Sequence, residues 1–238
     1  MLADEVVSIN RAGQLDSGIH RPEEWLSSLI EFIAGALPDW RDDPARKAET
    51  SETHLTTQLC ARLNSRSRHA PGWDILQFRR EDPDEVSAGR AIDLVAAPSG
   101  ETIVIGGREY NEYQPLLPIE CKRLPTPAGN KRDEREYLVS KFSSTGGVHR
   151  FKDGHHGSNH KRAAMIGYLQ NQDIVFWQGK MDVWIDGIVG DGMVGWSASD
   201  KLSLVGHDKA QRFAALQSRH ERAKTLDHIQ IDHLWIEM

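Results

Sequence analysis

The residues best suited to chemistry are an acid and a lysine two positions apart in an apolar stretch. The stretch is PLLPIECKRLPTP, residues 115–127, and it holds Glu120 and Lys122 before two prolines end it. In a strand, successive side chains alternate between the two faces. We therefore expect Glu120 and Lys122 to share one face, while Ile119 and Cys121 point to the other.

A second acid, Asp93, lies in the strand-like stretch GRAIDLVAA, residues 89–97. If the two strands are neighbours, Asp93, Glu120 and Lys122 converge at one point. Buried carboxylates are costly unless they are paired, and a divalent cation is a natural partner for them. Mg²⁺ prefers few carboxylates and keeps several waters, which leaves room for a phosphate oxygen. These residues predict metal-assisted phosphodiester hydrolysis with Lys122 near the attacking water; the alternative is a buried ion pair that holds the sheet together.

Asp93 in RAIDLV, followed by Glu120 and Lys122 in IECK, resembles the signature of the PD-(D/E)XK nuclease superfamily, which has the restriction endonuclease-like fold. The proline of that name is absent here, because Ile92 precedes Asp93. The resemblance implies that Asp93, Glu120 and the carbonyl of Cys121 bind Mg²⁺, for which Mn²⁺ can substitute. It also implies that Lys122 acts at the attacking water.

Members of that superfamily often carry a further acid on the helix before the sheet, and SETHLTTQLCARL offers Glu52. At 100° per residue, Glu52 falls within about 20° of Leu59 and Leu63, in the middle of the apolar stripe. A carboxylate that only sought solvent would not occupy that place. The alternative is a first-turn acid favoured by the helix dipole, with its head reaching out to water.

The later half carries a second resemblance. GVHRFKDGHHGSNHKRAAMIGYLQ, residues 147–170, and HERAKTLDHIQIDHLWIEM, residues 220–238, are similar to small PD-(D/E)XK proteins of bacterial defence-related gene neighbourhoods. The two resemblances cover about residues 50–238. They imply a nuclease-like domain over 46–238 and a role in defence against foreign DNA. Residues 1–45 carry no such resemblance, and we expect them to form an N-terminal helical extension. An activating or sensor protein and self-association remain open as partnerships.

The charge of the chain is uneven. The formal net charge is −6, yet residues 121–162 contain ten Lys/Arg and only four Asp/Glu. Such asymmetry predicts one positive face that follows nucleic-acid phosphates. We expect Lys131, Arg132, Lys161 and Arg162 to bind nucleic acid there; the alternative is a solvated helix of mixed charge.

Four histidines raise the alternative of a zinc site, and they are His149, His155, His156 and His160. Imidazole is a common zinc ligand, but the segment is broken by glycines and basic, so a polar loop beside the nucleic-acid groove is the simpler interpretation. His220 and Arg222 could touch phosphate, although decoration of a helix surface explains them as well.

Cys121 could be considered as a nucleophile, but strand alternation turns its thiol toward the core. Tyr137 and Lys141 are one helical turn apart and could line the groove or form a surface pair. Core packing explains four tryptophans better than base stacking does: Trp177, Trp184, Trp196 and Trp235.

The periodicity predicts an α/β protein in which helices flank a central mixed sheet. The expected helices are 21–37, ended by Pro38, a second from about 45 or 51 to 63, and further helical segments at 133–144, 147–158 and 159–170, with an amphipathic stretch at 210–223. The expected strands lie within 72–80, 89–97, 101–107, 113–124, 173–177, 201–205 and 229–238.

Composition narrows the class of protein. Two cysteines without framework spacing do not predict a disulfide-stapled secreted domain, and no apolar run is long enough for a membrane span. A cytoplasmic, Mg²⁺-dependent deoxyribonuclease fits these observations. The alternative is a non-catalytic nucleic-acid-binding or scaffold subunit of a larger defence complex.

Overall fold

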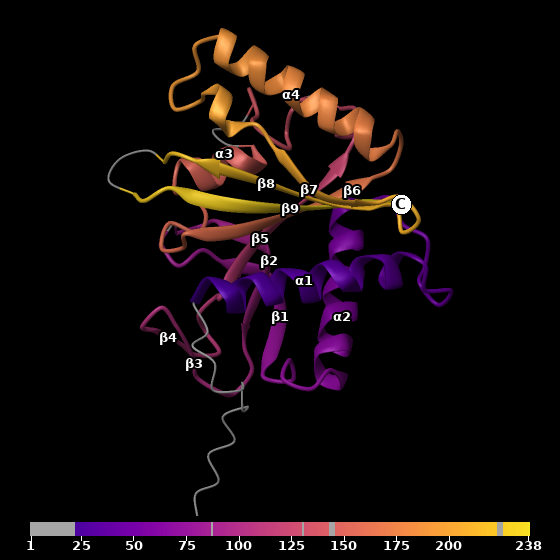
Figure 1. Cartoon of the computed structure of the whole chain (residues 1–238), viewed down its shortest axis with the longest axis vertical. Helices are drawn as coiled ribbons and strands as arrows, with labels where there is room; N and C mark the ends of the chain where they lie inside the picture. Colours follow the sequence, from indigo (N-terminus) through magenta and orange to yellow (C-terminus); the bar gives the residue numbers. More distant parts are fainter. Residues whose placement is uncertain (1–21, 87, 130, 143–145, 223–225) are drawn as a thin grey trace, which may run out of the picture.

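The structure is a computed structural model that describes residues 22–86, 88–129, 131–142, 146–222 and 226–238 (Figure 1). Residues 1–21 of the predicted N-terminal extension lie outside this part of the chain. A seven-stranded mixed sheet forms the centre, and β5, β6 and β9 run parallel within it. The strands in spatial order are β1 (Leu76–Pro83), β2 (Ala91–Pro98), β5 (Leu117–Leu124), β6 (Arg162–Leu169), β9 (Ile229–Glu237), β8 (Phe213–His220) and β7 (Ser203–Asp208).

Helices cover both faces of the sheet, which confirms the predicted α/β class (Figure 1). α1 (Pro22–Arg41) and α2 (Glu52–His69) pack on one face, and α3 (Gly147–Lys152) and α4 (Ile174–Gly190) lie on the other. A short hairpin of β3 (Ile103–Ile105) and β4 (Arg108–Tyr110) forms a separate sheet, and a 3₁₀ turn, η1, spans Ala198–Asp200. Within the described residues, no helix is long and apolar enough to cross a membrane.

Alternation along β5 divides its side chains between two hydrophobic cores, as the sequence predicts. Ile119 and Cys121 are fully buried in the core that α1 and α2 cover. Glu120 points to the other face, where α3 lies. The helix α1 contributes Leu29, Ile33 and other apolar residues to the same core as the strands.

The stretch 159–170, predicted to be helical, contains the central strand β6 instead. Every residue of β6 after Arg162 is buried. A parallel strand covered on both faces is apolar throughout and shows no alternation, so periodicity does not separate it from a buried helix.

Two other segments also form a different element from the one predicted: one is a helix where a strand was expected, and the other is a strand where a helix was expected. Residues 173–177 do not form a strand, because Asp173 caps α4 by accepting the backbone N–H of Phe176 at 2.8 Å. An aspartate before an apolar run is a common helix start. The amphipathic stretch 210–223 contains the strand β8, which is paired on both sides by β7 and β9.

The first helix also differs from its predicted end, because α1 contains Pro38 and continues to Arg41. Pro38 has no N–H to donate, so the helix loses one hydrogen bond there, but the N–H of Asp42 still donates to the Pro38 carbonyl at 3.0 Å. Beyond it, Trp40 is buried and Arg41 donates to the carbonyl of Gln211 at 2.6 Å. These tertiary contacts hold the final turn.

The predicted helix at 133–144 is replaced by a folded loop over the described positions up to 142. The Asp133 carboxylate accepts the backbone N–H groups of Arg135 and Lys141, both at 3.0 Å, which ties the two ends of the loop together. Tyr137 is fully buried within this loop. It therefore cannot line a groove beside Lys141.

His220 lies inside the molecule and not on a helix surface. Its Nδ1 is 2.5 Å from Asp200 Oδ1, and its Nε2 is 2.6 Å from Ser218 Oγ. Ser218 Oγ is also 2.7 Å from His233 Nε2, and His233 Nδ1 is 2.8 Å from the Tyr137 hydroxyl. Burial lowers the pKa of both histidines. With neutral rings, each group in this chain of hydrogen bonds finds a partner.

We predict that Gly167→Ala destabilises the fold. A Cβ at this position of β6 would lie 2.6 Å from Trp235 Cδ1, inside the core. Overpacking of this kind costs about 1–3 kcal/mol, which urea denaturation would measure. The matched control is Gly206→Ala on the edge strand β7, where a Cβ meets nothing within 4 Å. Equal stabilities of the two variants would contradict the packing argument.

Candidate active site

The Lys122 ammonium lies among acids from a helix and two strands. Its Nζ donates to Glu52 Oε1 at 3.1 Å, to Asp93 Oδ2 at 3.1 Å and to the carbonyl of Cys121 at 2.8 Å. Glu120 Oε2 is 3.6 Å from the same nitrogen. The predicted site residues Glu52, Asp93, Glu120 and Lys122 are therefore brought together. An ammonium has three N–H donors, and here all three are engaged.

The strand pairing explains why these groups meet. β2 and β5 pair antiparallel with Leu94 opposite Ile119, so the next positions, Asp93 and Glu120, lie beside each other near the middle of β5. The backbone N–H of Cys121 donates to Asp93 Oδ2 at 2.9 Å. This bond fixes the Asp93 carboxylate against the neighbouring strand.

Glu52 is held by the sheet and not by its own helix. It is the first residue of α2, and its Oε2 accepts the backbone N–H of Arg123 at 3.0 Å while Oε1 accepts from Lys122. Leu59 and Leu63 on the same side of the helix are fully buried. The carboxylate therefore points into the cluster, as the helical wheel predicts.

Two residues that the sequence analysis did not assign to the site hold Glu120. His156 Nδ1 is 2.7 Å from Glu120 Oε1, and Arg150 Nη1 donates to Glu120 Oε2 at 3.0 Å. Glu120 is completely buried, so these partners offset the cost of burying its charge. Arg150 belongs to the basic stretch and His156 to the group of four histidines, but nothing in their spacing links either residue to Glu120.

The acids differ in how readily they ionise. Burial raises the pKa of Asp93, and the nearby Glu120 charge raises it further. Burial alone would also raise the pKa of Glu120, but Lys122, His156 and Arg150 lower it to about 2. Burial alone would lower the pKa of Lys122, but Asp93, Glu52 and Glu120 raise it above its ordinary value. The lysine is thus a permanent cation at neutral pH.

A pocket of about 340 Å³ opens onto this cluster. Its wall combines the acids and the lysine with cations and small residues. The lining residues are Glu52, Asp93, Lys122, Lys131, Arg132, Glu136, Ser140, Phe142, Gly146, Gly147 and Arg150. A ligand in the pocket would meet both the carboxylates and a rim of positive charge, which is the environment that a phosphodiester with a cation requires.

The oxygen atoms beside the pocket are of the kind that Mg²⁺ prefers as ligands. Asp93 and the Cys121 carbonyl offer hard oxygens beside the pocket, and Mg²⁺ is commonly bound by one or two carboxylates plus waters. No three Asp, Glu, His or Cys side chains are arranged as a metal cluster within the described ranges. Glu120 uses both oxygens on His156 and Arg150. It could serve as a ligand only by sharing one of them.

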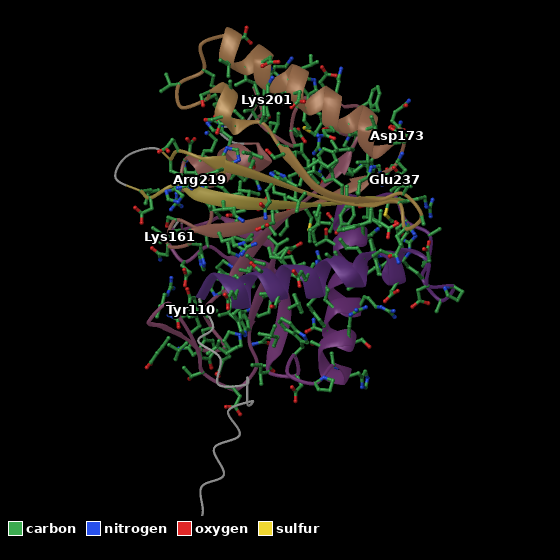
Figure 2. All side chains as sticks on the ribbon, in the orientation of Figure 1. Tyr110, Lys161, Asp173, Lys201, Arg219 and Glu237 are labelled. Carbon is green, nitrogen blue, oxygen red and sulfur yellow. The ribbon has the colours of Figure 1, made fainter. Side chains whose placement is uncertain are left out.

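The four predicted nucleic-acid-binding residues separate into two pairs. Lys131 and Arg132 line the pocket, where Arg132 also pairs with Glu136 at 2.8 Å. Lys161 directly precedes β6. On the neighbouring strand β5, Lys122 lies opposite Gly167 of β6. At about 3.3 Å per residue, Lys161 lies about 20 Å along the strand from the level of Lys122. Figure 2 shows Lys161 at the end of the sheet away from Glu237.

Arg162 is committed to the fold. Its Nε donates to Asp232 Oδ2 at 2.7 Å, and its Nη1 donates to Ser27 Oγ at 2.8 Å. Asp232 is almost completely buried, so the pair joins β6 to β9 and α1. The structure therefore does not bring Lys161 and Arg162 to the pocket that Lys131 and Arg132 line.

The four histidines of the candidate zinc site have separate surroundings. His149 is 3.2 Å from Asp153, His156 contacts Glu120, and His160 is 3.3 Å from Glu85. Burial lowers the pKa of His149 and His155. These positions do not form a shared metal centre, and His156 belongs to the candidate active site instead.

Cys121 and the tryptophans lie where the sequence predicts. The Cys121 thiol is fully buried, and burial raises its pKa, which disfavours the thiolate that a nucleophile needs. The four tryptophans predicted to pack in the core are all buried. Arg222 does not decorate a helix surface as one interpretation of the sequence had it, because its Nη1 donates to the Gly157 carbonyl at 3.2 Å.

Comparisons with protein-family models, with curated proteins and with solved structures found no match to this chain. The geometry of the cluster and its pocket is therefore the basis for assigning a function.

Proposed function

We propose that this protein is a Mg²⁺-dependent nuclease of the restriction endonuclease-like fold that hydrolyses phosphodiester bonds in DNA. The observation that carries the proposal is the contact of one partly buried lysine with Glu52, Asp93 and Glu120 beside a cation-rimmed pocket. A helix before the sheet and two paired strands supply these residues. This is the arrangement that the sequence resemblance implies.

In this proposal, Asp93 and the carbonyl of Cys121 would hold the metal, and Glu120 would contribute through an oxygen that it shares with Arg150. The bound metal would polarise the phosphoryl group and lower the pKa of a water. Lys122 keeps its charge at neutral pH and can release one of its three hydrogen bonds to orient that water. The positive charge of Lys122 would then stabilise the negative charge that develops on the phosphate.

The cations of the pocket rim would bind the DNA backbone. Lys131 and Arg132 lie on the rim with Arg150, and a neighbouring depression adds Arg135 and Lys141 next to Arg132. Such a track contacts phosphates without reading bases, so it supports backbone binding and carries no sequence preference. A defence role in the cytoplasm, with an activating or sensor protein, belongs to the same proposal and rests on the resemblance alone.

A specific observation favours a second candidate, a nucleic-acid-binding subunit that does not cleave. Both Glu120 oxygens already have partners, and all three Lys122 donors are used. A cluster of this kind could serve only to hold the sheet and α2 together. Incubation of the protein with plasmid, linear and single-stranded DNA and with RNA, in Mg²⁺, Mn²⁺ or EDTA, separates the candidates. Metal-dependent cleavage supports the nuclease, and binding without cleavage supports the second candidate.

We predict that Lys122→Ala lowers DNA cleavage by roughly a thousandfold, because the variant loses the cation that stabilises transition-state charge. Cleavage rates of the folded variant, verified by circular dichroism, measure the effect. Lys209→Ala, on the exposed turn after β7, is the control and should cleave like the wild type. Cleavage by Lys122→Ala near the wild-type rate would rule out this mechanism.

We predict opposite stability effects for two isosteric changes in the cluster. The pKa of Asp93 is raised, so its charged form is disfavoured by folding, and Asp93→Asn should be at least as stable as the wild type at neutral pH. The pKa of Glu120 is lowered from 4.5 to about 2. Each pKa unit is worth about 1.4 kcal/mol, so Glu120→Gln should lose about 3 kcal/mol.

The sign of the pH dependence also differs. The stabilisation from Glu120 is present above pH 4.5 and is lost as the pH falls toward 2, so the Glu120→Gln deficit shrinks in that window. The Asp93 penalty grows as the pH rises from 3.8. Urea denaturation across this range tests both signs, and a cleavage assay should find Asp93→Asn stable but inactive. A destabilised Asp93→Asn would favour a purely structural cluster.

We predict that the double variant Lys131→Ala/Arg132→Ala binds DNA more weakly and with a shallower salt dependence. The slope of log K against log salt should fall by about one for each phosphate that the variant no longer neutralises. Binding titrations at several salt concentrations measure it. Lys161→Ala, which removes a cation at the far end of β6, is the matched control; an equal effect of Lys161→Ala would move the DNA path away from the pocket.

A further inference from the structure

We propose that a second pocket, at the opposite end of the sheet from Lys122, binds a free mononucleotide. This hairpin pocket has a volume of about 570 Å³ and lies between the start of α1, the β3–β4 hairpin and the amino-terminal ends of β6 and β9. Figure 2 shows three of its residues, Tyr110, Lys161 and Arg219, along the side of the molecule opposite Glu237. The inference stands apart from the proposed nuclease activity.

The hairpin pocket is positively charged. Four of its lining residues are cations, and they are Arg108, Lys161, Arg162 and Arg219. None of the described residues that line it is Asp or Glu, although the whole chain has a formal net charge of −6. Cations gathered in a concave surface raise the local concentration of anions. Unlike the pocket at Lys122, this one offers no carboxylate to a metal, so its ligand is an anion that binds without one.

Arg219 is the cation best placed to hold a phosphate. It is exposed, its Nη2 donates to His228 Nε2 at 2.8 Å, and it pairs with no carboxylate in the part of the chain that the structure describes. Lys161 and Arg162 each already pair with an aspartate. A guanidinium has five N–H donors in a planar fork that matches the oxygens of a phosphate. Arg219 therefore has donors left for such a ligand.

The strand pairing sets a carboxamide beside Arg219. Arg219 of β8 lies opposite Gln230 of β9, and Gln230 lies opposite Arg162 of β6. Neighbouring strands are about 4.8 Å apart, so the three side chains form a row across the floor of the pocket. No hydrogen bond engages the Gln230 side chain within the described residues. A carboxamide offers a donor and an acceptor together, which is what the edge of a nucleobase can pair with.

The remaining wall of the hairpin pocket is apolar and aromatic. Leu116 and Tyr110 are buried there, and Leu26 and Ile105 are partly buried against the same core. Arg108 Cζ lies 4.5 Å from the centroid of the Tyr110 ring, which sets a flat cation on an aromatic surface. A bare phosphate ion would leave this wall uncovered, whereas pockets of about 300–1,000 Å³ hold ligands of drug size.

A nucleotide matches all three surfaces at once. Its phosphate would pair with Arg219, the edge of its base with Gln230, and the flat ring of its base would cover the apolar wall. The lining residues come from α1, from the hairpin and from the segment before β6 as well as from the sheet. Walls on several sides suit a compact ligand better than a strand that passes through, so we infer a free mononucleotide.

Isothermal titration calorimetry of the full chain in EDTA tests the inference with the 5′-mononucleotides of adenine, guanine, cytosine and uracil. We expect at least one to bind with a Kd on the order of 10 µM. Inorganic phosphate and the matching nucleoside should each bind at least tenfold more weakly, because each covers only part of the pocket. Equal affinity for either one, or no nucleotide binding up to millimolar concentration, overturns the inference.

Two variants locate the binding. Arg219→Glu should weaken the nucleotide at least tenfold, because it removes a charged donor and adds a repulsion. Lys209→Glu, on the exposed turn after β7, makes the same change of charge and should bind like the wild type. Gln230→Leu should weaken the nucleotide but leave the affinity for inorganic phosphate unchanged. Melting temperatures verify that each variant is folded.

Other results would move the ligand elsewhere. Nucleotide binding that persists in Arg219→Glu and is lost in Lys131→Ala/Arg132→Ala belongs to the pocket at Lys122 and overturns the inference. So does a single-stranded oligonucleotide that binds more than tenfold tighter than every mononucleotide and loses this affinity in Arg219→Glu, because the hairpin pocket would then hold a nucleic-acid strand. Since the titration contains no metal and measures no cleavage, its result is independent of the nuclease assay.

Discussion

The pairing of Lys122 with the acids around it is the interaction on which the rest of the site depends. Glu52, Asp93 and Glu120 would repel one another if they were left without a cation beside β5, and desolvation would add to that cost. One ammonium reaches all three of them. Because Lys122 is only 12% exposed, water screens these attractions weakly. The lysine therefore stabilises the approach of α2 to the two strands at the pocket.

The two strand carboxylates, Asp93 and Glu120, differ in how well their buried charges are compensated. Glu120 is completely buried and is held by His156, Arg150 and Lys122, which keep it ionised. Asp93 is less completely surrounded and accepts from Cys121 and Lys122 through one oxygen. Its pKa is raised, so its charge is the one that the fold tolerates least. A shifted pKa of this kind is found both in functional sites and in structural ion-pair networks, and the Asp93→Asn variant separates the two.

The sequence predicts which residues meet around Lys122 better than it predicts the elements that carry them. Strand alternation is a local rule, so it correctly sets Glu120 and Lys122 on one face and Cys121 on the other. The helical wheel likewise turns Glu52 inward with Leu59. By contrast, Arg150 and His156 join Glu120 through a tertiary contact across about 30 residues of chain. No spacing rule connects residues that meet only when α3 packs on β5.

The contrast between local sequence patterns and tertiary burial also explains which helices and strands were assigned wrongly from the sequence. β6 is buried on both faces, so its apolar residues lose the period of two that identifies a strand. β8 does alternate in burial, but polar Ser218 and His220 take two of its buried positions, which hides the alternation in the sequence.

The start of α4 is hidden for another reason. The helix begins with an apolar run like that of a strand, and only the Asp173 cap indicates a helix. Its outer face is apolar as well, which obscures the helical period. Because apolar side chains, among them valine and phenylalanine, lie on the exposed side of α4 as well as on its buried side, hydropathy alone does not separate the two faces of this helix.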